Sequence, residues 1–252
     1  MSTGVEREIL LQALEDELEP GRFQDYCPNG LQVEGRRRIR RMVTGVTASL
    51  ALIEAAIDFG ADLILVHHGY FWKGEPQAIT GMKHQRIAAL LQNQINLVAY
   101  HLPLDAHPRL GNNVQLGRRL GLRIEGVMGD NGIGLLGSFA EPRGADELVT
   151  VIAETLDREP LWISGGAHRV RRVGLCTGAA QSMLVAAAAH GVDAFISGEV
   201  SEQTTHEARE LGVHFYAAGH HATERYGPQA VGVWCAERFG IEHLFIDIAN
   251  PA

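Results

Sequence analysis

Two stretches of the sequence decide the fold class: RRMVTGVTASLALIEAAIDFGADLILVHH (40–68) and RRVGLCTGAAQSMLVAAAAHGVDAFISGE (171–199). In the first stretch, an apolar run over 42–47 precedes an Ala-rich helical segment over 48–59 and a second apolar run over 63–66. Short strands that are apolar throughout, alternating with helices, are typical of parallel strands buried on both faces. The pattern therefore predicts an α/β fold.

The two stretches also resemble each other, because they align without a gap at an offset of 131 residues. Further along, VAYHLPLD (98–105) aligns with YAAGHHATE (216–224), so that two His-x-x-x-carboxylate motifs coincide. The repeated order of elements predicts an internal duplication. We therefore expect two α/β domains of similar topology.

The first domain is expected over residues 1–126, with the HH and HxxxD motifs. The second is expected over 127–252, with the GE and HxxxE motifs. The Gly-rich segment GVMGDNGIGLLG (126–137) is interpreted as the linker, and a C-terminal strand is expected to pack back on the first half.

Polar side chains follow the apolar strands of both halves. In open α/β sheets, ligands bind beyond the carboxyl ends of the strands. Two halves that face each other would therefore bring the polar clusters into one cleft. These clusters are His67-His68, His101-x-x-x-Asp105, Glu199 and His220-x-x-x-Glu224.

Each cluster taken alone has a structural alternative. His67 and His68 could diverge toward two neighbouring ions at the end of a strand, or form a hydrogen-bonded pair in a loop. Asp105 follows Pro103 and suits either a metal site or a plain helix cap. His220 and Glu224 would share one helical face, either as ligands or as a surface pair.

Together, the clusters supply what a carboxylate-bridged two-metal site needs. Imidazoles offer neutral nitrogen ligands, and a carboxylate can span two ions roughly 3.5–4 Å apart. Two such ions keep net positive charge and attract an anionic substrate. The donor set is compatible with zinc, iron, manganese, nickel or cobalt.

Several of these segments resemble one known family. LILVHHGYFWKGE, YHLPLDAHPRLGNN, FISGEVSEQ and FYAAGHHATER, with PNGLQVEG near the start and FIDIANPA at the end, are similar to the YbgI-type branch of the NIF-three-like dinuclear-metal proteins. The resemblance covers essentially the whole chain. It implies two interlinked α/β domains with a two-metal site in the cleft between them, and a ring-shaped homohexamer.

The resemblance also assigns roles to individual residues. It places the metal ligands at His67, His68, Asp105, His220 and Glu224, with Glu224 bridging, and makes His101 a neighbour of the ligands. Family members are commonly named GTP cyclohydrolase 1 type 2 homologues. The expected function is therefore metal-dependent hydrolysis of a nucleotide or another anionic small molecule. The alternative is a non-catalytic metal-binding or metal-sensing scaffold that forms a ring.

The repeat alone adds one catalytic candidate, since Glu199 occupies the frame of His68 at the offset of 131. A carboxylate beside the metals could accept a proton as a general base, although a helix-capping or structural role is the alternative.

The composition of the chain disfavours several other classes of function. The net charge of −8 disfavours nucleic-acid binding, and no apolar run is long enough to span a membrane. Three widely spaced cysteines and the absence of a signal-peptide pattern favour the cytoplasm.

Overall fold

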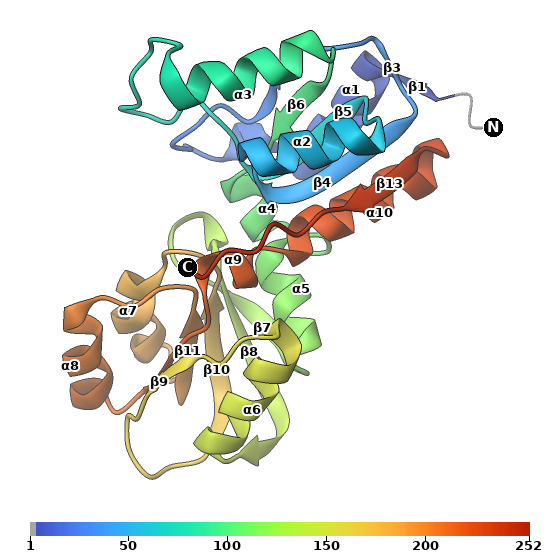
Figure 1. Cartoon of the computed structure of the whole chain (residues 1–252). Helices are drawn as coiled ribbons and strands as arrows, with labels where there is room; N and C mark the ends of the chain where they lie inside the picture. Colours follow the sequence, from blue (N-terminus) through green and yellow to red (C-terminus); the bar gives the residue numbers. More distant parts are fainter. Residues whose placement is uncertain (1–3) are drawn as a thin grey trace. The chain divides into compact units, whose positions relative to one another are not determined.

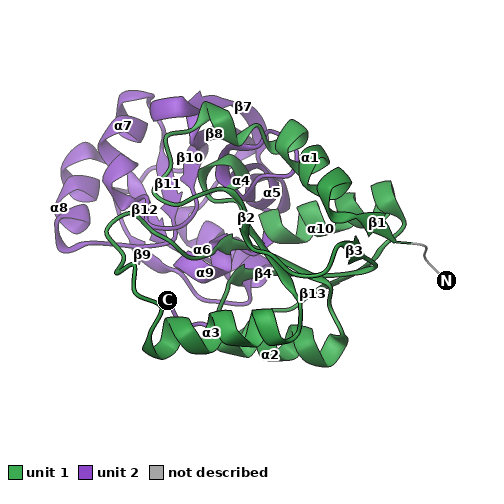
Figure 2. Cartoon of the chain, turned by 90° about the horizontal axis from the view of Figure 1, so that it is seen from above, with its two compact units in different colours: residues 1–104, 227–249 green, residues 105–226, 250–252 purple. Residues whose placement is uncertain are grey.

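The computed structural model describes residues 4–252, which divide into two compact units (Figures 1 and 2). Unit 1 comprises the chain up to Leu104 together with Gly227–Ala249. Unit 2 comprises Asp105–Tyr226 and Asn250–Ala252. The boundary expected at residues 126/127 lies inside strand β7 (Arg123–Met128), so the units do not coincide with the two halves of the sequence. No helix over the described residues is long and apolar enough to cross a membrane.

Unit 1 is a five-stranded sheet with helices on both faces, which confirms the α/β class. The strand order is β13-β4-β5-β6-β2, and all neighbours are parallel except β2 and β6. The strands are β13 (Glu242–Phe245), β4 (Arg41–Thr47), β5 (Leu63–His68), β6 (Asn96–Ala99) and β2 (Gly30–Val33). Helices α2 (Leu50–Phe59) and α3 (Gly81–Gln92) cover one face of the sheet. On the other face lie α1 (Arg7–Leu18) and α10 (Tyr226–Phe239), as Figure 2 shows.

The sequence explains why these elements form where they do. In α2, the Ser49 hydroxyl accepts a hydrogen bond from the Leu52 amide at 3.2 Å, and Gly60 ends the helix in the left-handed conformation. Alternate side chains of β4 and β5 face the two helical layers, so both strands are apolar throughout. A short pair of antiparallel strands, β1 (Val5–Glu6) and β3 (Arg38–Ile39), lies outside this sheet.

Unit 2 is built around a six-stranded mixed sheet of order β7-β8-β10-β11-β12-β9. The strands after β7 are β8 (Gly134–Arg143), β9 (Leu161–Ile163), β10 (Val170–Cys176), β11 (Ala194–Ser197) and β12 (His214–Ala217). Strands β10, β11 and β12 are parallel, and the outer pairs are antiparallel. The Gly-rich segment expected to be a linker instead forms the end of β7, a tight turn and the start of β8.

Alternation along β11 and β12 divides the core of unit 2 into two layers. Ile196 and Tyr216 pack in the cluster that includes α5 (Asn112–Arg119) and α6 (Ala145–Leu156). Their neighbours Phe195 and Phe215 pack in the opposite cluster, which includes α7 (Leu184–Ala189) and α8 (Glu202–Leu211). The period of two explains why these strands carry large apolar residues without interruption.

The two units share details that an internal duplication predicts. Met42 of β4 pairs with Leu63 of β5, and Val173 of β10 pairs with Ala194 of β11, which is the same register at the offset of 131. The matched aspartates make matched bonds as well. The Asp62 carboxylate accepts from the amides of residues 40 and 41 at 2.7 and 3.0 Å, and the Asp193 carboxylate accepts from those of 171 and 172 at 2.9 and 2.8 Å. The paired arginines thus mark the start of a strand in each unit.

Candidate metal centre

The carboxyl ends of β5 and β6 position three histidines of unit 1. His67 and His68 are the last residues of β5, and His101 follows β6 and precedes the short helix α4 (Leu102–Ala106). Parallel strands end at the same edge of a sheet, which places these side chains together. One ligand nitrogen from each of the three lies within 4.8 Å of the others, so unit 1 alone gathers a three-histidine cluster.

Hydrogen bonds at Nδ1 orient the rings of His67 and His68. Nδ1 of the buried His67 donates to the Tyr100 carbonyl at 3.1 Å. In the neutral ring this bond leaves Nε2 as the nitrogen that can bind a metal. Nδ1 of His68 is hydrogen-bonded to the Thr47 hydroxyl at 3.2 Å. Such partners fix ring orientation and tautomer in metal-binding histidines.

A carboxylate holds His101 in the same way. Nδ1 of His101 donates to Asp25 at 2.7 Å, and the second Asp25 oxygen accepts from Asn29 at 3.0 Å and from the Leu102 amide at 2.9 Å. Although burial acts to raise the pKa of Asp25, the bonds from His101 and Asn29 lower it to about 2. Asp25 is therefore ionised and serves as a fixed acceptor. Burial raises the pKa of the nearby Cys27 thiol to about 12, which disfavours a thiolate ligand.

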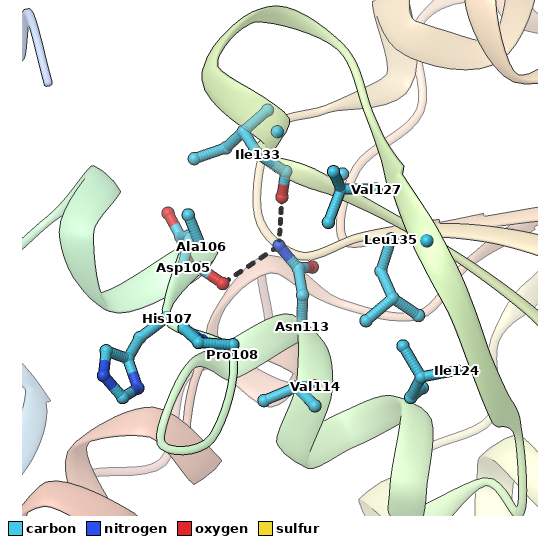
Figure 3. Close-up of a pocket in the computed structure, with 13 residues that line it drawn as sticks. Asp105, Ala106, His107, Pro108, Asn113, Val114, Ile124, Val127, Ile133 and Leu135 are labelled. Carbon is cyan, nitrogen blue, oxygen red and sulfur yellow. Dashed lines mark hydrogen bonds between the residues drawn. The ribbon is translucent and has the colours of Figure 1, made fainter. Parts of the chain in front are cut away.

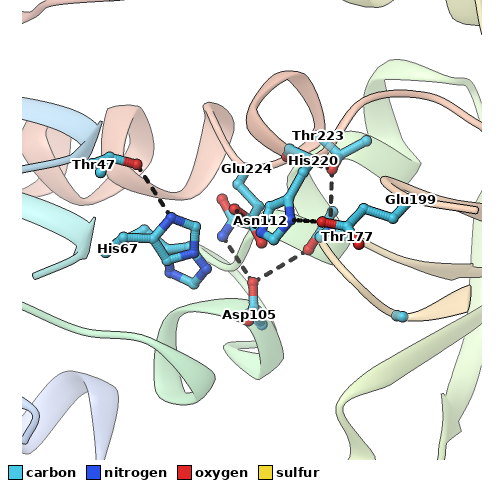
Figure 4. A network of polar contacts seen from close by, with 12 residues as sticks. Thr47, His67, Asp105, Asn112, Thr177, Glu199, His220, Thr223 and Glu224 are labelled. Carbon is cyan, nitrogen blue, oxygen red and sulfur yellow. Dashed lines mark hydrogen bonds and ion pairs between the residues drawn. The ribbon is translucent and has the colours of Figure 1, made fainter. Parts of the chain in front are cut away.

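In unit 2, the carboxylate of Asp105 is held from two sides. Its Oδ1 accepts from the Asn112 amide at 2.9 Å and from the Thr177 hydroxyl at 3.2 Å (Figure 4). Asn113 joins the same segments, because its side chain donates to the Asp105 and Ile133 carbonyls and accepts from the Thr177 amide. Asp105 is thus tied both to the start of α5 and to the end of β10.

His220 and Glu224 lie on the loop and short helix after β12. Helix α9 (His220–Thr223) places the two residues in contact, with Nε2 of His220 at 3.2 Å from Oε2 of Glu224. Nδ1 of His220 donates to Glu199 at 2.7 Å, and Glu199 follows β11 (Figure 4). Burial acts to lower the pKa of His220, but the bonds and charges of Glu224 and Glu199 raise it to about 9.

Gly178 makes room for the Glu224 carboxylate. It has a φ of +69°, and a Cβ at this position would lie 2.1 Å from Oε1 of Glu224 and 3.2 Å from Nε2 of His220. No side chain fits there without displacing Glu224. The Gly178 amide also donates to the Thr223 hydroxyl at 3.1 Å, which connects the end of β10 to α9.

The charges of unit 2 suit a divalent cation. Asp105 is 7% exposed and Glu224 is 2% exposed, and a ligand oxygen of one lies within 4.8 Å of a ligand oxygen of the other. Two buried carboxylates this close repel each other and lose hydration, and a cation offsets both effects. In the metal-free chain a proton on His220 supplies part of that positive charge. Nitrogen and carboxylate donors of this kind fit zinc and the other first-row divalent metals.

The structure gathers the predicted residues within each unit. His67, His68 and His101 form one set, and Asp105, Glu199, His220 and Glu224 lie in unit 2. Sequence reasoning missed the residues that hold them: Asp25, Asn112, Thr177 and Gly178. Asp25 and Asn112 lie in or near segments already singled out for the family resemblance, but Thr177 and Gly178 carry no distinguishing pattern. In the Arg-rich stretch 36–41, Arg36 pairs with Asp62 and Arg38 pairs with Glu6, so these two arginines serve the structure of unit 1.

Comparison with known families decides where the chain belongs. A model of the Duf34/NIF3 (NGG1p interacting factor 3) family matches residues 5–251. The chain belongs to this family. Its relatives include a GTP cyclohydrolase 1 type 2 homolog of Pseudomonas aeruginosa, 55% identical over 96% of this chain and 97% of the relative. The homolog of the same name from Vibrio cholerae is 54% identical over 96% of this chain and 98% of the relative.

Two solved structures share the fold of this chain. The protein ybgI, described as of unknown function, matches with a TM-score of 0.95 and 51% identity, over 98% of this chain and 100% of that one. TTHA1606 of Thermus thermophilus matches with a TM-score of 0.90 and 34% identity, over the same shares of the two chains. The predicted family is therefore confirmed.

Proposed function

We propose that this Duf34/NIF3 protein binds two divalent metal ions and hydrolyses an anionic small molecule, with a nucleotide such as GTP as the first candidate. His67 and His68 of unit 1 and Asp105, His220 and Glu224 of unit 2 would be the ligands. Bound divalent ions would supply Lewis acidity and an activated water for hydrolysis. The names of the Pseudomonas and Vibrio relatives support the choice of GTP as the first substrate to test.

The observation that carries this proposal is the buried pair Asp105 and Glu224. Carboxylates that are nearly inaccessible and within 4.8 Å of each other need compensating positive charge. A histidine with a raised pKa compensates for one of them, and a divalent cation compensates for both. The fixed Nδ1 bonds of His67 and His220 support the same conclusion, because they direct Nε2 toward a metal.

Glu199 has two candidate roles, and its contact with His220 favours one of them. A carboxylate that accepts a hydrogen bond from Nδ1 of a ligand histidine orients that ring and makes Nε2 a stronger metal ligand. We propose this positioning role. General-base action, suggested by the repeat, stays a prediction. Glu199→Gln keeps an acceptor oxygen for His220, so it should retain the metals, and a loss of turnover in this variant would indicate proton transfer.

The test of the hydrolase is turnover of GTP and a panel of nucleotides and other anionic metabolites by the metal-loaded protein. We expect activity that disappears in Asp105→Ala and Glu224→Gln and persists in Glu202→Gln, a matched change on the exposed surface of α8. The variants also control for contaminating nucleotidases, because activity from a contaminant would be equal in the preparations of the parent chain and of the variants. Activity that survives in Glu224→Gln would contradict the proposal.

The second candidate function is a metal-binding or metal-sensing scaffold. The family resemblance supports a homohexameric ring, and the three free cysteines suit a reducing compartment such as the cytoplasm. The two functions differ in one measurement. A scaffold would form the ring in a metal-dependent manner, as followed by light scattering, and turn over no member of the substrate panel.

A further inference from the structure

Unit 2 contains a pocket that the metal ligands do not account for. It lies between the β7–β8 hairpin and the segment that leads from Asp105 into α5 (Figure 3), and its volume is about 140 Å³. The side chains of Val114, Ile124, Val127 and Leu135 converge on this space in Figure 3. The pocket is built entirely from residues 105–135, so it belongs to unit 2 alone.

The polar groups at the pocket are already engaged. Both N–H bonds of the Asn113 amide are directed at backbone carbonyls, to Ile133 at 2.6 Å and to Asp105 at 3.3 Å, and its oxygen accepts from the Thr177 amide at 2.8 Å. Nδ1 of His107 accepts from the Leu110 amide at 2.9 Å, and the ring points away from the other lining side chains in Figure 3. A ligand that needs hydrogen bonds would therefore lose them on entry.

The size of the pocket indicates which group fits. An apolar cavity of about 150 Å³ in another protein stays dry and binds benzene. A pocket of about 140 Å³ therefore suits one six-membered ring. A polar heterocycle such as a pyrimidine base has the same size, but its carbonyl and N–H groups would be buried without hydrogen-bond partners, which weakens its binding.

We propose that this pocket binds a single apolar ring of a small-molecule ligand, with the polar remainder of that ligand on the side of Asp105. The inference deepens the proposed function, since Asp105 lines the pocket and is also a candidate metal ligand. It adds an apolar or phenyl-like group to the description of the ligand, and a nucleobase that needs hydrogen bonds at its edges would not occupy this pocket. Binding of the isolated ring depends on neither metal nor turnover.

Gly126 offers a way to fill the pocket. It lies in β7, its φ is outside the left-handed region, and a Cβ added there meets no heavy atom within 4 Å. A leucine at this position would occupy the pocket without backbone strain. Gly21 is the matched control, because its backbone is also unstrained and a Cβ there also meets nothing within 4 Å, but it lies in unit 1.

The experiment is a titration of the metal-free full chain with toluene, followed by NMR of the Ile, Leu and Val methyl groups. Uracil, a polar ring of similar size, is titrated in parallel. We expect saturable shifts at Val114, Ile133 and Leu135 with toluene, at least about ten-fold weaker binding in Gly126→Leu, and no change in Gly21→Leu. Uracil should bind at least about ten-fold more weakly than toluene.

Three results would overturn the proposal: no saturable binding of toluene, equal affinity in Gly126→Leu, or uracil binding as tightly as toluene. A second variant, Val127→Asp, covers the case in which Gly126→Leu fails to fold. Val127 is 61% exposed, so the substitution should be tolerated, and a charge at the pocket should weaken toluene binding by a similar factor. If toluene does not bind, the proposed metal centre is not contradicted. If the chain does not bind metal, the prediction of toluene binding still stands.

Discussion

At the scale of single residues, Gly178 connects backbone conformation to the candidate metal site. A methyl group at this position would collide with the Glu224 carboxylate, and the φ of +69° adds backbone strain. We expect Gly178→Ala to weaken metal binding by about ten-fold or more, as measured by competition with a chelator of known affinity.

Gly191→Ala is the control for strain in that experiment. Gly191 has the same φ of +69°, but a Cβ there would approach only the flexible end of Arg172 at 3.2 Å. Both variants should lose roughly 1 kcal/mol of stability, and only Gly178→Ala should lose metal affinity. Equal metal affinity in the two variants would show that the Glu224 carboxylate does not need its present position.

Asn112 and Thr177 act on the metal site through Asp105. Removing either hydrogen bond frees the carboxylate to rotate, so Asn112→Ala and Thr177→Val should each weaken metal binding by about 10–100-fold. Calorimetric titration with zinc measures the effect. Asn93→Ala at the end of α3 removes a comparable side-chain bond in unit 1, and it should leave the affinity unchanged. An effect of the same size in Asn93→Ala would contradict the assignment.

The sequence revealed the candidate ligands because histidines and carboxylates stand out at the ends of apolar strands. It did not reveal what holds them. Thr177 contributes a hydroxyl group, and Gly178 contributes the absence of a side chain. Both roles arise from contacts with residues 45 or more positions away in the sequence, which a local pattern does not reveal. Similarly, the Gly-rich segment 126–137 has the composition of a linker, but pairing with β8 and β10 turns it into part of a sheet.

At the scale of elements, Asp62 and Asp193 stabilise the starts of β4 and β10. Each accepts two backbone hydrogen bonds, and Asp62 is also bonded to Arg36 at 2.9 Å. After the competing hydrogen bonds to water are counted, each such bond contributes roughly 0.5–1.5 kcal/mol to stability. We expect Asp62→Ala to lower the free energy of unfolding by roughly 2–4 kcal/mol and Asp193→Ala by about half as much, because Asp193 is more exposed.

Urea denaturation of both variants measures these changes, with Asp58→Ala on the surface of α2 as control. Losses in both aspartate variants would support matched roles in a duplicated frame. A loss in Asp62→Ala with none in Asp193→Ala would contradict matched roles for the two aspartates.

Strand β13 carries a pH-sensitive packing contact. His243 is hydrogen-bonded to the Thr44 hydroxyl at 2.9 Å, and its ring lies where a Cβ of Gly232 would be. Burial lowers the pKa of His243 below its usual 6.5. The folded state therefore binds this proton less well than the unfolded state. The contribution of the neutral His243 to the stability of the folded state is complete above pH 6.5, and it is lost as the pH falls through the pKa of His243 in the folded state.

We expect His243→Gln to lose stability less steeply than the parent chain as the pH falls from about 8 to about 5. Urea denaturation in the presence of a chelator measures the slope without interference from metal binding. His84→Gln, a change at an exposed position of α3, should keep the parent slope. If His243→Gln shows the same slope as the parent chain, another titratable group causes the loss of stability at low pH, and the assignment to His243 is wrong.

At the scale of the whole molecule, the chain crosses between the two units three times, at residues 104/105, 226/227 and 249/250. The five proposed ligands are divided between the units, two in unit 1 and three in unit 2. The proposal therefore needs both ligand sets, and loss of either should reduce the metal content.

Metal content per chain is the most direct test of the central claim. The full chain is stripped with chelator, reloaded with zinc, iron, manganese, nickel or cobalt in turn, desalted and measured by elemental analysis. We predict two ions per chain with at least one of these metals, and no more than one in His67→Ala, Asp105→Ala or Glu224→Ala. A parent chain that never holds more than one ion, or a Glu224→Ala variant that still holds two, would contradict the account.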